Sequence, residues 1–309
     1  RKIVKSKEIC IFTSILLLYL FYFVVFGSVN AKTFDKHNNL NTNVNFTRAK
    51  IIFSSLCDAY KRKKVSGDAC HRLCINRNWT ISHFSEENKV VLEIEVDGRR
   101  VILKSLHPNI DDYEVPPEGE THDKFLLRIR DKAENQTTIG WPRNLSHHLL
   151  SILWPKIHRS RSKQLRSVDR RSLWALVQQP EYLTFRTISI SGLTPKVMGT
   201  CGHMYEVEAL APFRLASDWI NLKGEIVSHS LSTLKLFYEF LNEPIQWCDA
   251  RFENLGLSAE YPNRFVLMDG DFLFTESKFK SLTFNKTCKT DDDCSVGHCT
   301  SECLSDSKC

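Results

Sequence analysis

The stretch that decides the fold is WCDARFENLGL, residues 247–257, which holds Asp249 and Asn254 in the spacing D-x-x-x-x-N. This is the spacing of a phosphoryl-transfer catalytic loop, in which the Asp serves the acceptor hydroxyl and the Asn holds a metal ion. The usual His-Arg pair before the Asp is absent, and Trp247 and Cys248 stand in its place. The motif alone is common, so the rest of the chain must decide between a working site, a relic and coincidence.

Length and composition are those of an ordinary globular protein. The chain has 309 residues, of which 42% are hydrophobic and 25% charged, and this length suits one large domain or two smaller ones. The net charge of +6 is mild and its basic residues are dispersed, so we predict no nucleic-acid partner. Because the chain opens at Arg1 without Met and stops at Cys309 in a cysteine cluster, we expect a fragment that continues beyond Cys309.

An uncharged apolar run covers residues 9–29 and is long enough to cross a bilayer as a helix. Four basic residues lie before it in residues 1–8, and only Lys32 follows closely. This asymmetry predicts a short cytosolic tail, a signal anchor at 9–29 and a luminal body, the type II single-pass topology. The alternative is a cleaved signal peptide with VNA at 29–31 as its cleavage site, but the apolar run is long for that.

Two further features indicate the secretory pathway. Five N-x-[ST] sequons occur, and ten of the eleven cysteines follow the apolar run, which suits an oxidising compartment; the sequons are at Asn45, Asn78, Asn135, Asn144 and Asn285. We therefore expect a membrane-anchored protein of the endoplasmic reticulum, with the Golgi as the alternative location.

The first luminal segments precede the main domain. Residues 30–50 are polar and Asn-rich, and we interpret them as a stem without a folded core. Residues 51–85 form a cysteine-rich segment with Cys57, Cys70 and Cys74. Disulfides suit these cysteines better than zinc, since no C-x-x-C or His pair lies nearby.

The following chain predicts alternating hairpins and helices. Asp97-Gly98 lies between two alternating runs in residues 89–105, a strong hairpin signal, and the second run carries Lys104. Residues 107–150 are polar with two sequons and are predicted to be a glycosylated surface insertion. Helical spacing in 170–188 is interrupted at Pro180, and residues 190–210 have the texture of two short strands. A helix at 231–242 and a hairpin spanning 255–269 complete the order.

Each role in phosphoryl transfer has a candidate in the required chain order. A strand lysine reaches the phosphates, a helix carboxylate holds that lysine, an Asp serves the acceptor, and an Asn with a second Asp binds the metal. The candidates are Lys104, Glu181, Asp249, Asn254 and Asp269, with Asp271 as a further metal oxygen. Each residue alone has a bland explanation as a turn, cap or surface residue, but five in order favour the catalytic interpretation.

Several motifs in order resemble the divergent protein kinase domain family 1, and the resemblance runs from about residue 50 to 309. They are SLCDAYKRKKVSGDACHRLC, RVILKS, SLWALVQQPEYL, PKVMGTCGHMYEVE, WCDARFENLGL and FVLMDGDF. Members of that family are cysteine-rich type II membrane proteins of the endoplasmic reticulum with a kinase-like luminal domain. A Cys-Asp pair replaces Arg-Asp in that family too, so the missing His-Arg is a family trait.

The resemblance implies an α+β, two-lobed protein-kinase-like fold at residues 86–309, preceded by a transmembrane helix and the small cysteine-rich segment. It implies ATP with Mg²⁺ or Mn²⁺ as cofactors and a luminal protein or glycan as acceptor. By the same resemblance Lys104 and Glu181 match the strand–helix ion pair, Asp249 matches the catalytic-loop aspartate, and Asn254 and Asp269 match the metal-binding pair.

Two departures from the family pattern matter. The family's EF-hand-like insertion corresponds to HRSRSKQLRSVD, residues 158–169, which lacks the acidic ligands and the Gly that a calcium loop needs, so we expect no calcium there. Ordinary kinases cover the phosphates with a Gly-rich loop, but residues 82–101 contain only Gly98.

The cysteine-rich insertion at residues 288–309 stands where an activation segment would follow. It holds five cysteines, an odd number, so one partner lies elsewhere; Cys201 and Cys248 are the candidates.

Three functional interpretations remain. A luminal kinase-like phosphotransferase explains all five positions and ranks first. A pseudokinase that acts as a binding or scaffolding module is close behind, because the roof glycines are missing. A nucleotide-sugar glycosyltransferase that uses the D-x-D at 269–271 is a distant third, since no alternating βαβ pattern precedes it.

Overall fold

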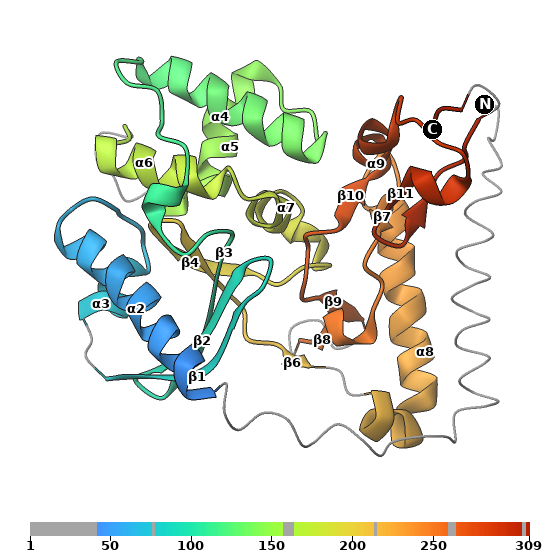
Figure 1. The fold of residues 1–309 in the computed structure, drawn as a ribbon, viewed down its shortest axis with the longest axis horizontal. Coiled ribbons are helices and arrows are strands. Elements are labelled where there is room, and N and C mark those ends of the chain that lie inside the picture. The colour runs from blue at the N-terminus through green and yellow to red at the C-terminus, as the bar shows by residue number, and fades with distance from the viewer. Residues whose placement is uncertain (1–41, 76–77, 157–163, 213–214, 259–263, 305–306) are drawn as a thin grey trace. The chain divides into compact units, whose positions relative to one another are not determined.

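The computed structural model describes most of the chain from residue 42 onward, as a mixed α/β structure (Figure 1). The described residues are 42–309 without 76–77, 157–163, 213–214, 259–263 and 305–306. Within them, no helix has both the length and the apolar character that a membrane span requires. The predicted cytosolic tail at 1–8 and anchor at 9–29 lie outside the described residues, as does the first half, 158–163, of the calcium-loop position at 158–169.

A five-stranded antiparallel sheet, in the order β1-β2-β3-β5-β4, forms the first half of the structure. Its strands are β1 (Trp79–Glu86), β2 (Val90–Val96), β3 (Arg99–Ser105), β4 (Val197–Cys201) and β5 (Met204–Val207). The β2–β3 turn places Asp97 at φ 51° and Gly98 at φ 73°, the left-handed conformation that a tight hairpin turn needs. The hairpin predicted from Asp-Gly is therefore confirmed.

Helices cover both faces of this sheet. Successive side chains of β3 point to opposite faces, so neighbouring residues of β3 pack against different helices. On one face lie α2 (Thr42–Lys61) and α3 (Cys70–Ile75), whose buried side chains form one core with Val101 and Leu103. The opposite face carries Ile102 of β3 and packs against four helices. These are α4 (His122–Thr137), α5 (Ser146–Leu153), α6 (Ser167–Leu176) and α7 (Pro180–Thr187). Lys104, two residues after Ile102, points to the same face as α7.

The prediction that residues 107–150 are a surface insertion is wrong. Helix α4 buries Phe125, Leu126, Ile129 and Ala133 in the core beneath the sheet, and α5 adds three leucines to it. These four apolar positions recur with helical spacing and make one continuous stripe. The segment seemed polar because the remaining faces of α4 are rich in charged residues, which face solvent.

The predicted domain boundaries also shift. Helix α2 begins at Thr42, inside the expected stem of residues 30–50, because Ala49, Ile52, Phe53 and Leu56 form an apolar stripe that the sheet covers. Strand β1 begins at Trp79, so the sheet starts within the expected cysteine-rich segment of residues 51–85 and not at residue 86.

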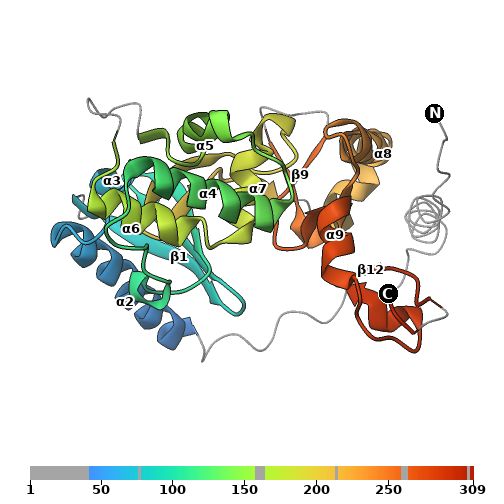
Figure 2. The same cartoon turned by 90° about the horizontal axis from the view of Figure 1, so that it is seen from above.

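The described residues of the C-terminal half form two helices, both labelled in Figure 2, and three small antiparallel sheets. The helices are α8 (Leu215–Glu239) and α9 (Glu276–Thr283). The strands are β6 (Ala211–Pro212), β7 (Ile245–Trp247), β8 (Leu255–Leu257), β9 (Phe265–Leu267), β10 (Leu273–Thr275), β11 (Ser295–Val296) and β12 (Cys299–Thr300). Short 3-10 turns elsewhere in the described chain are η1 (Ile110–Asp112), η2 (Arg143–Leu145), η4 (Ser189–Ser191), η5 (Phe252–Asn254) and η6 (Asp291–Cys294). The predicted β8–β9 hairpin is confirmed.

Five disulfides link the described cysteines, which confirms disulfides and not zinc for the N-terminal group. The pairs are Cys57–Cys74, Cys70–Cys201, Cys248–Cys299, Cys288–Cys303 and Cys294–Cys309. Of the two partners considered for the odd cysteine of residues 288–309, Cys248 is correct. Cys201 instead joins α3 to the end of β4, and thereby fastens the cysteine-rich segment to the sheet.

Candidate active site

Lys104 reaches into the space between the sheet and the C-terminal half. Its position on β3 turns the side chain toward α7, and 9% of that side chain is exposed. Its Nζ donates to Oε1 of Glu181 at 2.8 Å and to the backbone carbonyl of Met268 at 2.7 Å. The predicted lysine–glutamate pair is therefore brought together, from positions 77 residues apart in the chain.

Glu181 is the most heavily bonded residue of the cluster. It lies in the first turn of α7, where Pro180 at the first helical position fits the fixed backbone angle of proline. Besides Lys104, its carboxylate accepts hydrogen bonds from Tyr205 Oη at 2.6 Å and from the Gly270 backbone N–H at 3.1 Å. Burial alone would raise the pKa of Glu181, but the ammonium groups of Lys104 and Lys89 outweigh it and lower that pKa to about 2. Glu181 is thus held as a buried anion.

Asp269 and Asp271 follow β9 and flank a glycine that must remain a glycine. A Cβ on Gly270 would lie 2.6 Å from the Phe185 ring and 3.3 Å from Glu181 Cγ. This close approach allows the Gly270 N–H to bond Glu181 and places the two aspartates beside it. Burial, followed by the nearby charge of Glu181, raises the pKa of Asp271. Negative charge is therefore concentrated at this point.

Lys89 completes the cluster, and no pattern in the sequence had marked it as a site residue. Its Nζ lies 2.9 Å from Asp269 Oδ1, 2.8 Å from Asp271 Oδ2 and 3.1 Å from Glu181 Oε1. Lys89 sits in the turn between β1 and β2, where a kinase Gly-rich loop would lie over the phosphates. A lysine in that glycine-poor turn was the signal that could have revealed it.

Asp249 and Asn254 form a second group after β7. Asn254 Nδ2 donates to Asp249 Oδ2 at 2.8 Å, and Arg251 Nε donates to Asp249 Oδ1, also at 2.8 Å. The Cys248–Cys299 disulfide and the bond from Cys248 N–H to the Phe272 carbonyl fix the residue before Asp249. The backbone carbonyl of Asn254 accepts from Met268 N–H at 2.8 Å, which ties this group to the residue before Asp269.

The oxygen atoms that converge fit a hard divalent cation. Carboxylate oxygens of Glu181, Asp269 and Asp271 lie within 4.8 Å of one another. Oxygen donors of this kind are those that Mg²⁺ and Mn²⁺ prefer. Glu181 thus joins the predicted Asp269 and Asp271 in this set, while the Asn254 amide nitrogen donates to Asp249 and leaves its Oδ1 available as a ligand.

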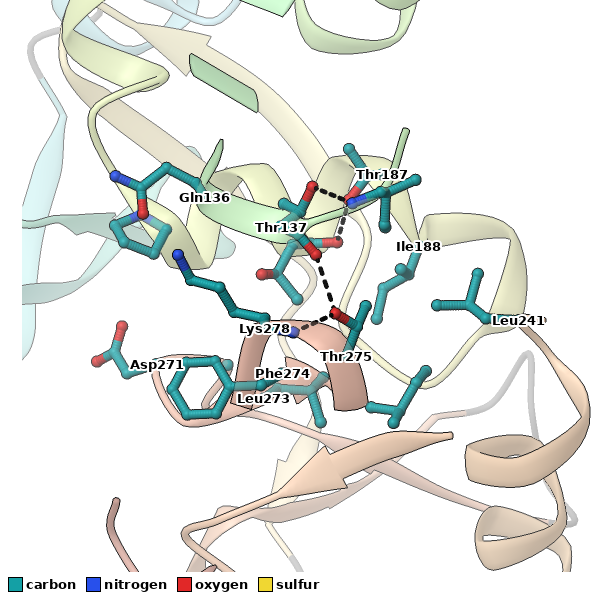
Figure 3. Close-up of a pocket in the computed structure, with 15 residues that line it drawn as sticks. Gln136, Thr137, Thr187, Ile188, Leu241, Asp271, Leu273, Phe274, Thr275 and Lys278 are labelled. Carbon is teal, nitrogen blue, oxygen red and sulfur yellow. Dashed lines mark hydrogen bonds between the residues drawn. The ribbon is translucent and has the colours of Figure 1, made fainter. Parts of the chain in front are cut away.

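A small pocket lies behind this cluster, between α7 and the start of α9. It is lined by Pro180 and Thr184 of α7 and by Gly270 and Asp271 (Figure 3). Across it, the Thr275 hydroxyl donates to the Thr137 carbonyl at 3.3 Å, and the same hydroxyl accepts from Lys278 N–H at the start of α9. The end of α4 is thus hydrogen-bonded to the C-terminal half beside Asp271.

Two family models match the chain on either side of its middle. The one described as the protein-kinase domain of FAM69 matches residues 173–309, and the one described as the N-terminal cysteine-rich ER segment of FAM69 matches residues 1–125. Together the matched ranges include Lys89 and Lys104 on the sheet and all the predicted aspartate, asparagine and glutamate site residues.

Proposed function

This chain belongs to the FAM69 family of divergent kinase-like, cysteine-rich proteins, and from that premise we propose that it is an ATP-dependent phosphotransferase. We propose a two-lobed kinase-like fold in which the five-stranded sheet and α7 form the first lobe and the segments after β5 form the second. The acceptor would be a protein or glycan hydroxyl in the secretory pathway.

The observation that carries this proposal is the buried Lys104–Glu181 ion pair beside Asp269 and Asp271. Burying two charges costs free energy that their attraction barely repays, so such a pair is poor evidence of a purely stabilising role. In phosphoryl transfer it has a clear use, because the glutamate holds the lysine where it neutralises phosphate oxygens. The 2.8 Å contact holds Lys104 in place, and the low pKa of Glu181 keeps its partner carboxylate charged.

The remaining residues have assignable roles. Asp269 and Asp271, with Glu181 or Asn254, would hold Mg²⁺ or Mn²⁺, which when bound screens the charge of the triphosphate. Asp249 would accept the proton of the acceptor hydroxyl. The hydroxyl oxygen would then bond to the γ-phosphorus, and the bond between the γ-phosphorus and ADP would break. Asn254 holds the Asp249 carboxylate by its 2.8 Å hydrogen bond, and the Cys248–Cys299 disulfide fixes the loop.

We propose a single-pass type II location in the endoplasmic reticulum membrane with the body in the lumen. The family description as a cysteine-rich ER segment supports this, as do five disulfides. The asparagines of four sequons are exposed, as glycosylation requires: Asn78, Asn135, Asn144 and Asn285.

A pseudokinase is the second candidate, because Lys89 already supplies a cation to the three carboxylates and the β1–β2 turn has no glycine. A D-x-D glycosyltransferase is less well supported. All strand pairs among the described residues are antiparallel, whereas nucleotide-sugar enzymes of that kind rest on parallel βαβ units.

Nucleotide binding is tested by thermal unfolding of the luminal body with ATP and Mn²⁺. At about a hundredfold excess over the dissociation constant, we expect the melting temperature to rise by about 5–10 °C. Asp269→Asn should weaken binding at least about tenfold and remove about half of this rise or more, because the metal loses a charged ligand. Asp292→Asn, an exposed aspartate in the acidic η6 turn, is the matched control and should behave like the wild type. A wild-type protein that shows no metal-dependent rise would refute the proposal.

Turnover separates the enzyme from the pseudokinase. Asp249→Asn should retain the ATP-dependent rise in melting temperature but slow phosphate transfer to a luminal glycoprotein extract, or ATP hydrolysis, by about 100-fold or more. The asparagine side chain at position 249 can still hydrogen-bond to Asn254, but it cannot accept the proton of the acceptor hydroxyl. If the wild type and Asp249→Asn show the same residual rate of phosphate transfer, Asp249 has no catalytic role and the pseudokinase interpretation is favoured.

A further inference from the structure

Lys89 occupies the position in the cluster where a divalent cation would bind. Its ammonium group contacts one oxygen from each of the three carboxylates that converge, at 2.8–3.1 Å. Only 13% of the Lys89 side chain is exposed, so the contacts are not those of a loose surface lysine. The ammonium donates hydrogen bonds to Asp269 and Asp271 and forms an ion pair with Glu181, so all three carboxylates hold it in place.

A metal ion and this ammonium cannot occupy the cluster together. Mg²⁺ binds its oxygen ligands at about 2.0–2.1 Å, and the oxygens it would need are the ones that Lys89 bridges. Within the described part of the chain, the three carboxylates are paired with two lysines, Lys89 and Lys104. The cluster therefore keeps a net negative charge, which favours a divalent over a monovalent cation.

We propose that Lys89 is an internal competitor for the divalent cation: it holds Glu181, Asp269 and Asp271 together before the metal binds, and it leaves when the metal enters. The inference rests on the proposed function, because it takes these carboxylates as the metal site. Where the binding-competent state is only a fraction of the population, the apparent affinity falls by that fraction. Lys89 therefore sets the metal concentration at which the site fills.

The test is isothermal titration of the luminal body with Mn²⁺ alone, without nucleotide. Lys89→Gln removes the competing charge and should raise the Mn²⁺ affinity by about tenfold or more. Lys89→Arg keeps a cation in the turn and should stay within about threefold of the wild type. Asn88→Ala in the same turn and Lys61→Gln on α2 control for turn geometry and net charge; both should leave the affinity unchanged, since exposed distant charges are screened.

A second measurement needs no variant. The Lys89 amine should resist acetylation in the metal-free protein and become reactive as Mn²⁺ is added, whereas the exposed Lys61 should react equally in both states, as mass spectrometry of peptides would show. Unchanged Mn²⁺ affinity in a folded Lys89→Gln protein would overturn the inference. So would Mn²⁺ binding to the wild type without increased labelling of Lys89, or the absence of Mn²⁺ binding in both proteins.

The two proposals fail separately. If ATP and Mn²⁺ raise the wild-type melting temperature but Lys89→Gln gains no Mn²⁺ affinity, the competitor role falls and the proposed function stands. If Lys89→Gln binds Mn²⁺ more tightly but ATP raises the melting temperature of neither protein, Lys89 competes with the cation at a metal site and the phosphotransferase proposal is refuted.

Discussion

Replacing Glu181 with glutamine should lower the free energy of unfolding by about 3–5 kcal/mol, the cost of leaving buried charges without their partner. Glu181 accepts from Lys104, Tyr205 and the Gly270 backbone, pairs ionically with Lys89, and only 3% of its side chain is exposed. Glutamine keeps one oxygen that can accept from Lys104, but it removes the negative charge that balances the buried ammonium groups. Urea unfolding of the protein in oxidising buffer measures the change.

Glu93→Gln is the matched control, since Glu93 of β2 forms a more exposed ion pair with Arg100 of β3 in the same sheet. An exposed pair contributes about 0.2–1 kcal/mol, so this variant should be nearly as stable as the wild type. Adding Lys104→Met to Glu181→Gln should recover part of the loss, because no unpaired buried ammonium remains at position 104. Equal costs for Glu181→Gln and Glu93→Gln would show that the buried cluster is not held as described.

Removing the Cys70–Cys201 disulfide by double alanine substitution should lower the free energy of unfolding by about 5 kcal/mol. This bond joins cysteines 131 residues apart, and the entropy that a cross-link removes from the unfolded chain grows with loop length. Both cysteines are replaced together so that no reactive thiol remains. Denaturant unfolding without reductant measures the loss.

The Cys288–Cys303 bond provides the control for loop length. Its cysteines are 15 residues apart, and its double alanine variant should lose about 3 kcal/mol. The longer loop should therefore cost about 2 kcal/mol more than the shorter one. If the short-loop variant loses as much stability as the long-loop variant, chain entropy is not the source of the stabilisation at Cys70–Cys201.

Local signals predicted the elements well where they were strong. The Asp97-Gly98 hairpin, the break at Pro180 and the strands around Cys201 follow from turn chemistry and side-chain period. Helix α4 was missed although its apolar stripe has helical spacing, because the charged residues around the stripe make the segment polar as a whole. In this segment the spacing of the apolar residues predicted the structure better than the overall polar composition did.

The predicted site residues gather into two adjoining groups, but chain order alone did not show how. It predicted that Asn254 would face Asp269; the structure shows in addition that Asn254 hydrogen-bonds Asp249 and that Glu181 lies beside Asp269 and Asp271. Lys89 was missed because its only local signal is its place in a glycine-poor turn, and its partners lie 92 to 182 residues further along the chain.

The sequence by itself determined the two hairpins, the helix break at Pro180, the lysine, glutamate and aspartates available for chemistry, and the disulfide-bonded state of the cysteines. Those properties depend on near neighbours, on side-chain period and on compartment. Only the tertiary structure decided which cysteines pair, that α4 lies in the core, and that Lys89 bridges three carboxylates. Such contacts depend on distances of a few ångströms between residues far apart in the chain, and burial makes their charges act strongly on one another.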